Sequence, residues 1–225
     1  MKNLLIAAIP FCLLFFACKK SDSSKVLQED KGCIYQVTVP VSTHTISNAD
    51  IPIVNSLFLN NNIDNRNFRY YQYMQDSLQT QYPPYIKVDY KTVRVDQYIN
   101  GLRIFNNDLV FNFKNNVLYH TSGTIITVTK LNTITHLTFG QLRKLFINNI
   151  EQFDHKSNQY KDSCLYAEFG YYNLNSGTGY STENLIKAWK VTPKSNPALL
   201  VYPVAYYKDE SGELIYYDNG IRTFK

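Results

Sequence analysis

The sequence holds few of the residues that carry metal or nucleophilic chemistry. It has four histidines and four cysteines, and no histidine is followed by glutamate, so the H-E-x-x-H zinc motif is absent. The histidines are too far apart in sequence to form a recognised ligand pair: His44, His120, His136 and His155. No serine stands in the G-x-S-x-G context of a nucleophile elbow. These absences predict a protein that is not an enzyme and that holds no metal and no cofactor.

Concentrated charge of one sign is also lacking. The 23 Lys and Arg against 18 Asp and Glu give a formal net charge of +5, but the basic residues are scattered, with no run beyond Lys19-Lys20. A nucleic-acid-binding surface needs its basic residues clustered on one face or along one element. The sequence therefore predicts that nucleic acid is not a partner.

Aromatic residues, in contrast, are abundant. The chain has 19 Tyr and 13 Phe against one Trp and nine Gly. Such a composition favours half-buried strands, in which a ring packs inward and a hydroxyl reaches water. With 225 residues, 44% of them hydrophobic, the chain is long enough for one domain or for two small units in close contact. We expect a sheet-rich protein.

The first residues have the features of a targeting segment. Lys2 gives a positive start, and the apolar stretch from Leu4 to Ala17 is interrupted by Pro10 and too short to span a bilayer comfortably. Residues 1–17 are therefore predicted to be a signal peptide. Its end, "FFACKK", resembles the lipobox of bacterial lipoproteins, in which the cysteine, here Cys18, is lipidated after cleavage.

This resemblance implies a lipoprotein of the cell envelope, attached to a membrane through lipid on Cys18 and lying outside the cytoplasm, at the outer membrane on its periplasmic or surface side. The polar residues 18–31 are expected to form a flexible tether, because their low hydrophobicity cannot support packing. A plain secretory signal followed by a chance cysteine is the alternative.

Two cysteines remain in the part of the chain that is expected to fold, Cys33 and Cys164. A disulfide between them would close a loop of about 130 residues and contribute at most about 5 kcal/mol in the chain-entropy model. Strand alternation, however, places Cys164 on a face with Tyr166 and Glu168, which looks more exposed than the face of Cys33. A disulfide and two free thiols are both left open.

Residues 32–130 are predicted to form a first α+β unit. Ser47 and Asp50 are suitable caps for a helix over 47–59. Asn100-Gly101 is the strongest hairpin signal, because both central positions of a type I′ turn need positive φ. The strands of this unit are expected at 33–41, at 68–75 and within a hairpin region from 88 to 129.

Residues 131–225 are predicted to repeat this plan with the helix first. Thr138 and Gln141 form a capping-box pattern at the start of an apolar stripe that runs to about residue 153. Strands rich in β-branched and aromatic residues follow at 163–172, 185–193, 199–209 and 213–218. The predicted fold class is therefore α+β, with two units that each lay a helix on an antiparallel sheet.

The segment "VRVDQYINGLRIFNNDLVFNFKNNVLYHTSG", residues 93–123, resembles the fungalysin/thermolysin propeptide motif. Its matching features are Gln97-Tyr98, the turn at Gly101, the pair Leu102 and Ile104, the strand at Leu109-Val110, and the closing Gly123. Residues 188–220 are similar, more loosely, to the PepSY domain that comes next in such propeptides. The usual glycine pair of the turn is replaced by Asn106-Asn107.

This resemblance implies a non-catalytic binding module without its peptidase domain, able to inhibit an exported peptidase in trans. The alternative is a structural or accessory envelope lipoprotein with no inhibitory role. Tyr70, Tyr71 and Tyr73 alternate across a strand, so that some are expected to face away from the core and to bind a partner protein or peptide. Strand addition is expected at an edge strand near the hairpin of residues 95–114 or at the C-terminal end, residues 215–224.

Overall fold

The computed structural model describes residues 26–29, 32–79, 81–128, 132–176, 184–194 and 203–220, so the predicted signal peptide and Cys18 lie outside the described residues. Within them are eleven strands and three helices. In chain order these are β1 (Val26–Glu29), β2 (Gly32–Val37), α1 (Asp50–Asn60), β3 (Phe68–Gln79), β4 (Lys87–Ile99), β5 (Leu102–Phe105), β6 (Leu109–Lys114), β7 (Val117–Ser122), α2 (Phe139–Asp154), α3 (Ser157–Tyr160), β8 (Leu165–Asn173), β9 (Leu185–Pro193), β10 (Val204–Lys208) and β11 (Leu214–Asp218).

The strands form one continuous mixed sheet, which confirms the sheet-rich α+β class. Its strand order is β11-β10-β9-β8-β5-β4-β6-β7, with β3 beside β4, β2 beside β8, and β1 beside β2. Most neighbours are antiparallel, as predicted. The pairs β2–β8 and β5–β8 are parallel, so a purely antiparallel arrangement is wrong at these two positions.

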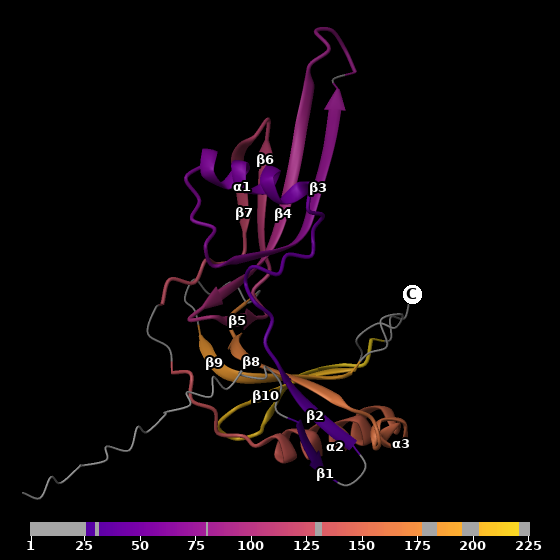
Figure 1. Ribbon diagram of the computed structural model, residues 1–225. Helices are drawn as coiled ribbons and strands as arrows, with labels where there is room; N and C mark the ends of the chain where they lie inside the picture. Colours follow the sequence, from indigo (N-terminus) through magenta and orange to yellow (C-terminus); the bar gives the residue numbers. More distant parts are fainter. Residues whose placement is uncertain are drawn as a thin grey trace, which may run out of the picture.

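Helix α1 covers one face of β3, β4, β6 and β7 (Figure 1). It begins at Asp50 with Ala49 as its N-cap, so the predicted start at Ser47 is three residues too early. The Ser47 hydroxyl still donates to the Asp50 carboxylate and accepts from the Asp50 amide in the turn before the helix. Its buried stripe consists of Val54, Leu57 and Phe58, and the Phe58 ring lies 5.0 Å from the Phe111 ring in an edge-on contact. These residues belong to the hydrophobic cluster of the N-terminal half.

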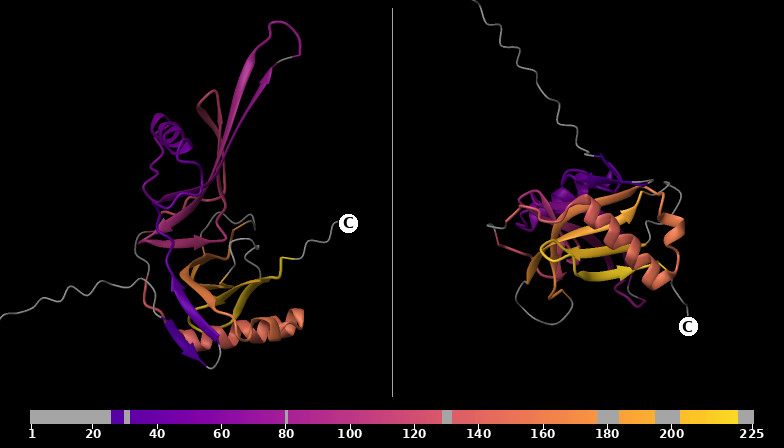
Figure 2. Two further views of the ribbon diagram at one scale, coloured as in Figure 1. Left: turned by 45° about the vertical axis from the view of Figure 1, so that its right-hand side comes forward. Right: turned by 90° about the horizontal axis from the view of Figure 1, so that it is seen from below.

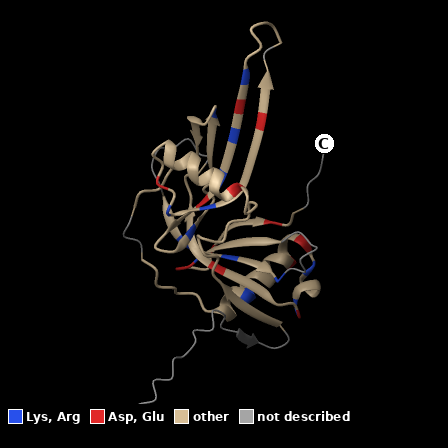
Figure 3. Ribbon diagram, turned by 45° about the horizontal axis from the view of Figure 1, so that its top comes forward, with Lys and Arg blue, Asp and Glu red and all other residues tan. Residues whose placement is uncertain are grey.

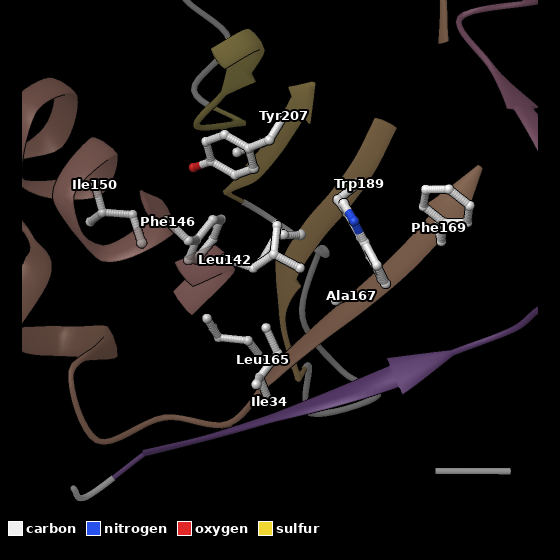
Figure 4. Packing of buried hydrophobic residues seen from close by; sticks show 11 residues of the cluster. Ile34, Leu142, Phe146, Ile150, Leu165, Ala167, Phe169, Trp189 and Tyr207 are labelled. Atoms are coloured by element: carbon white, nitrogen blue, oxygen red, sulfur yellow. The ribbon is translucent and has the colours of Figure 1, made fainter. Parts of the chain in front are cut away.

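Helix α2 lies against β8, β9 and β10 and forms the second hydrophobic cluster (Figure 4). The predicted capping box is present, since Thr138 and Gln141 satisfy each other's backbone amides. Leu142, Phe146 and Ile150 are fully buried and point toward the strands, where Trp189 and Tyr207 are among the largest buried side chains. The end of the predicted stripe differs, because Phe153 is half exposed and stacks on Tyr217.

Strand β2 joins the C-terminal half of the sheet rather than the N-terminal unit in which it was expected. It pairs with β8 in parallel, with Ile34 opposite Leu165. Strand β1 in turn pairs with β2, so residues 26–29 of the predicted tether form a strand. The boundary expected at residue 130 therefore does not separate two units of contiguous sequence.

The parallel register of β2 and β8 also decides the state of the two cysteines. Cys33 and Cys164 each precede a paired residue and form a disulfide, with their Cα atoms 4.4 Å apart. The expectation that the Cys164 face is exposed is wrong at Glu168, which is only 7% exposed. The disulfide ties β2 to the start of β8 across 131 residues of sequence.

The hairpin between β4 and β5 takes the chain from one half of the sheet to the other. Asn100 and Gly101 have φ of 52° and 76°, which confirms the predicted turn with two positive-φ residues. After the turn, β5 pairs with β4 at Leu102 and Arg103 and then with β8 at Ile104 and Phe105. A short strand thus joins the two halves.

The molecule is elongated because β3 and β4 continue as a two-stranded ribbon beyond α1 and β6 (Figures 1 and 2). Their pairing extends to Gln79 opposite Lys87, whereas β6 accompanies β4 only as far as Tyr90. In Figure 1 and in the left view of Figure 2, β1, the first described strand, lies at the end of the molecule opposite to the ribbon's end.

Candidate functional site

The three tyrosines predicted to bind a partner do not form an exposed group. Tyr70 is 1% exposed, and its hydroxyl donates to Asn55. The half-buried Tyr71 donates its hydroxyl to Asp108. Tyr73 is also half buried and packs against the same hydrophobic cluster as Tyr70. Two of the rings thus pack in the cluster under α1 and Tyr71 lies outside it, and the expected role of the three tyrosines in binding a partner stays a prediction.

A group of exposed apolar residues lies instead at the end of the β3–β4 ribbon. We call residues 77–79 and 81–87 the hairpin tip; each of them is exposed. Its large apolar side chains are Leu78, 57% exposed, Tyr82, 78%, Tyr85, 64%, and Ile86, 53%. Sequence analysis identified Pro83-Pro84 as a break between strands but missed this surface. The signal was present in the "YPPYI" stretch at 82–86.

Two outer strands of the sheet lie at or beside the predicted segments. Residues 95–114 contain β5, β6 and the end of β4, which each pair with two or more strands, and the outer strand β7 follows this hairpin directly. Among the described strands, β1, β3, β7 and β11 each pair with one neighbour only. Strand β11 overlaps the second predicted segment, 215–224. Of β3, β7 and β11, strand β7 carries the most exposed apolar pair outside the tip, Val117 at 63% and Tyr119 at 57%.

A buried group of charges lies where the two halves of the sheet meet. Asp96 on β4 accepts from Arg69 on β3 and from Arg103 on β5, each at 2.7 Å. The Arg103 guanidinium also lies 3.9 Å from the Glu168 carboxylate on β8. Glu168 stands opposite Lys190 in the β8–β9 pairing. The ion pairs of this group thus link four strands, β3, β4, β5 and β8, through side chains.

Burial shifts the ionisation of this group. It raises the pKa of the Glu168 carboxyl despite the nearby Arg103, and it lowers the pKa of the Lys190 ammonium. Burial also raises the pKa of the Tyr98 hydroxyl to about 12. An adjoining pocket of about 350 Å³ is lined in part by Arg69 and Arg103. Since both arginines already donate to Asp96, we assign the group a structural role at the junction.

A second buried carboxylate, Asp209, holds the segment that leads into α2. It is fully buried and accepts from the amides of His136 and Leu137, at 3.0 and 3.2 Å, and from the indole of Trp189, at 2.8 Å. Lys187 lies 3.4 Å away. His136 Nδ1 is 2.9 Å from the carboxylate, while half of the His136 side chain is exposed. These contacts fix the entry to α2 against β9.

Residues that could bind a metal do not gather in the part of the chain that the structure describes: it contains no group of three His, Cys, Asp or Glu side chains arranged for one. His136 and Asp209 form a pair, with Lys187 Nζ also 2.9 Å from the imidazole. The other histidines contact different partners. His120 contacts Ser122, and His44 contacts Tyr70.

His44 is held between a backbone amide and an aromatic ring. Its Nδ1 accepts from the Tyr70 amide at 3.0 Å, and its ring stacks on the Tyr70 ring with centroids 4.3 Å apart. Burial and the nearby Arg69 lower the pKa of His44 below its ordinary value of 6.5. The folded protein therefore favours the neutral imidazole, because a proton on Nδ1 would remove the acceptor.

We expect this histidine to make the folded state sensitive to mild acid. Because the pKa of His44 is lower in the folded state, its contribution to stability is complete above about pH 7.5 and is lost as the pH falls below 6.5 toward the folded pKa. His44→Asn keeps an acceptor near the same place and cannot be protonated. The free energy of unfolding, measured in urea between about pH 7.5 and 5, should fall less for the variant. The control His120→Asn should lose as much stability over this pH range as wild type does. If the free energy of unfolding falls equally in wild type and His44→Asn, the prediction is wrong.

No family model, curated protein or solved structure matches this chain. Among the described helices, none is long and apolar enough to cross a membrane. A function must therefore be inferred from the arrangement of the residues described above, together with the resemblances in the sequence.

Proposed function

We propose that this chain is a lipid-anchored binding module of the cell envelope, outside the cytoplasm, which docks a partner polypeptide and performs no chemistry itself. In this proposal the molecule has two helix-covered layers. The layer of α1 over β3, β4, β6 and β7 is a propeptide-like unit, and the layer of α2 over β8 to β10 is a PepSY-like unit. They hold the outer strands in place for the partner.

This proposal rests mainly on the outer edge of β7. Among the described residues only β6 pairs with this strand, and Val117 and Tyr119 extend from it into solvent. An extended peptide can add to such an edge through backbone hydrogen bonds, while pockets on the partner accept alternate side chains. Asn61 already bonds the Leu118 amide, so addition would use the rest of the strand.

The kind of partner is suggested by the resemblance of residues 93–123 to a metallopeptidase propeptide. In secreted peptidases such a segment blocks the catalytic cleft of the enzyme that follows it on the same chain. We infer that this chain acts on an exported peptidase in trans, with β7 entering the cleft as an added strand. Both side chains of the exposed pair would then fill pockets beside the cleft.

The test is a titration of residues 19–225, which retain every contact described above, against thermolysin-like peptidases of the same envelope. Micromolar protein should slow at least one of them, and Val117→Ser/Tyr119→Ser should weaken inhibition about tenfold or more. Tyr85→Ser/Ile86→Ser, which removes an equally exposed pair from the hairpin tip, should inhibit like wild type. If no peptidase is slowed, the structural or accessory role is favoured instead.

The anchor is tested separately. Cys18→Ala should release the protein from the membrane fraction after a salt wash and abolish labelling by a fatty-acid analogue, because stable anchoring requires two or more acyl chains and the variant has no thiol to receive them. Ser21→Ala, a change in the predicted tether, should remain attached and labelled. A Cys18→Ala protein that still sediments fully with membranes and still takes up label would rule out this anchor.

A further inference from the structure

The hairpin tip exposes four large apolar side chains within nine residues of sequence. Leu78 lies on β3, near the end of its pairing with β4, and Tyr82, Tyr85 and Ile86 follow within the loop and its return. A fluid lipid surface can take up such a group without a pocket of matching shape, so the gathering of these side chains in a loop favours a lipid surface.

The charges near the tip agree with this. Between residues 77 and 87 the sequence holds one charged residue, Lys87, and no carboxylate. Figure 3 shows the loop at the end of the ribbon without charge and the charged residues further down its two strands. Tyrosines prefer the boundary between headgroups and acyl chains, and a lysine beside them attracts lipid phosphates. The first carboxylates, Asp76 and Asp89, lie further along the strands and would remain in water.

The backbone limits how deep the tip can enter. The ribbon has two strands, so the outward-facing amides and carbonyls of its distal part have no neighbouring strand among the described residues. Such groups cannot be placed in the hydrocarbon core without hydrogen-bond partners, but water reaches them at headgroup depth. The tip therefore suits the interfacial layer of a membrane, not a position across it.

We propose that the hairpin tip is a membrane-contact site that inserts Leu78, Tyr82, Tyr85 and Ile86 into the interfacial layer of a phospholipid bilayer. This contact depends neither on lipid at Cys18 nor on the β7 edge. The tip and β1 lie at opposite ends of the elongated molecule (Figures 1 and 2), so a chain held at both ends would lie along the bilayer surface. Strand β7 would then stay available for a polypeptide partner.

The test uses residues 19–225, which lack both the lipidated cysteine and the apolar leader. Wild type should sediment with vesicles of phosphatidylethanolamine and phosphatidylglycerol, and Tyr85→Ser/Ile86→Ser should lower the partition coefficient about tenfold or more. Val117→Ser/Tyr119→Ser removes one tyrosine and one aliphatic side chain of matching exposure and should partition like wild type. Equal melting temperatures for the variants would show that each is folded.

A second measurement locates the contact. Trp189 is the only tryptophan and is 1% exposed, so its emission should be constant, whereas a tryptophan placed by Tyr82→Trp should shift to shorter wavelength on adding vesicles. Tyr119→Trp should not shift. The proposal is overturned if wild type does not bind these vesicles, if the tip variant binds as well as wild type, or if only the residue 119 probe responds. The last result would indicate a lipid contact at β7.

Discussion

Replacing Asp209 with alanine is expected to lower the free energy of unfolding by about 3–5 kcal/mol. The change removes a buried carboxylate and leaves its buried hydrogen-bond donors and its cationic neighbour without a partner. The carboxylate is fully buried. Without it, the His136 and Leu137 amides and the Trp189 indole lose their acceptor, and the Lys187 ammonium loses a counter-charge 3.4 Å away. The entry to α2 would separate from β9.

Two further variants show whether the loss comes from this geometry. Asp209→Asn keeps one acceptor oxygen and removes the charge, so it should destabilise less than alanine. Glu210→Ala removes the neighbouring carboxylate, whose side chain is 76% exposed, and should change stability by less than about 1 kcal/mol. Urea unfolding followed by Trp189 fluorescence reports directly on the site. Equal effects of Asp209→Ala and Glu210→Ala would contradict the role given to Asp209.

The stability of the protein at acidic pH should also depend on the Asp209 carboxylate. Burial alone would raise the pKa of Asp209, but hydrogen bonds from His136, Trp189 and Leu137 outweigh it, and the pKa lies below the ordinary 3.8. A carboxyl with a lowered folded pKa stabilises the protein above its unfolded pKa, and this contribution is lost as the pH falls through the folded pKa. Wild type should therefore lose more stability below about pH 4 than Asp209→Asn does.

Much of the secondary structure could be predicted because its signals are local. The capping box at Thr138 and Gln141 and the turn at Asn100-Gly101 each depend on a few adjacent residues, and both are present as expected. The pairing of β2 with β8 could not be predicted. Alternation in a strand indicates which face is buried but not which strand lies beside it, and these two are separated by more than 100 residues.

The tyrosines of β3 show how a bulge limits what strand alternation can predict. Alternation placed Tyr71 and Tyr73 on one face and Tyr70 on the other. The β3–β4 pairing shifts between Tyr70 and Gln72, so Tyr71 is an extra residue, and Tyr70 and Tyr73 both contact the hydrophobic cluster under α1. A bulge of this kind has no strong sequence signal. The hairpin tip was missed for a related reason, since its exposure depends on β6 being only six residues long and on β3 and β4 continuing beyond it.

Removing the disulfide by Cys33→Ser/Cys164→Ser is expected to cost about 2–5 kcal/mol in the free energy of unfolding, because the bond closes a loop of 131 residues and restricts the unfolded chain. The parallel pairing of β2 with β8 involves only four residue pairs, and β1 is held to the sheet by β2. Loss of the bond should therefore also increase amide exchange locally, first in β1 and β2.

Other contacts should keep the double-serine protein folded while this happens. Arg143 on α2 donates to the carbonyls of Cys33 and Ser163, so the two strand ends remain linked through the helix after the bond is removed. Urea unfolding with and without a reductant checks the assignment. Reductant should lower the stability of wild type to that of the double variant and leave the variant unchanged. If reductant does not affect wild type, then Cys33 and Cys164 contribute as thiols, and the loop between them is closed by packing alone.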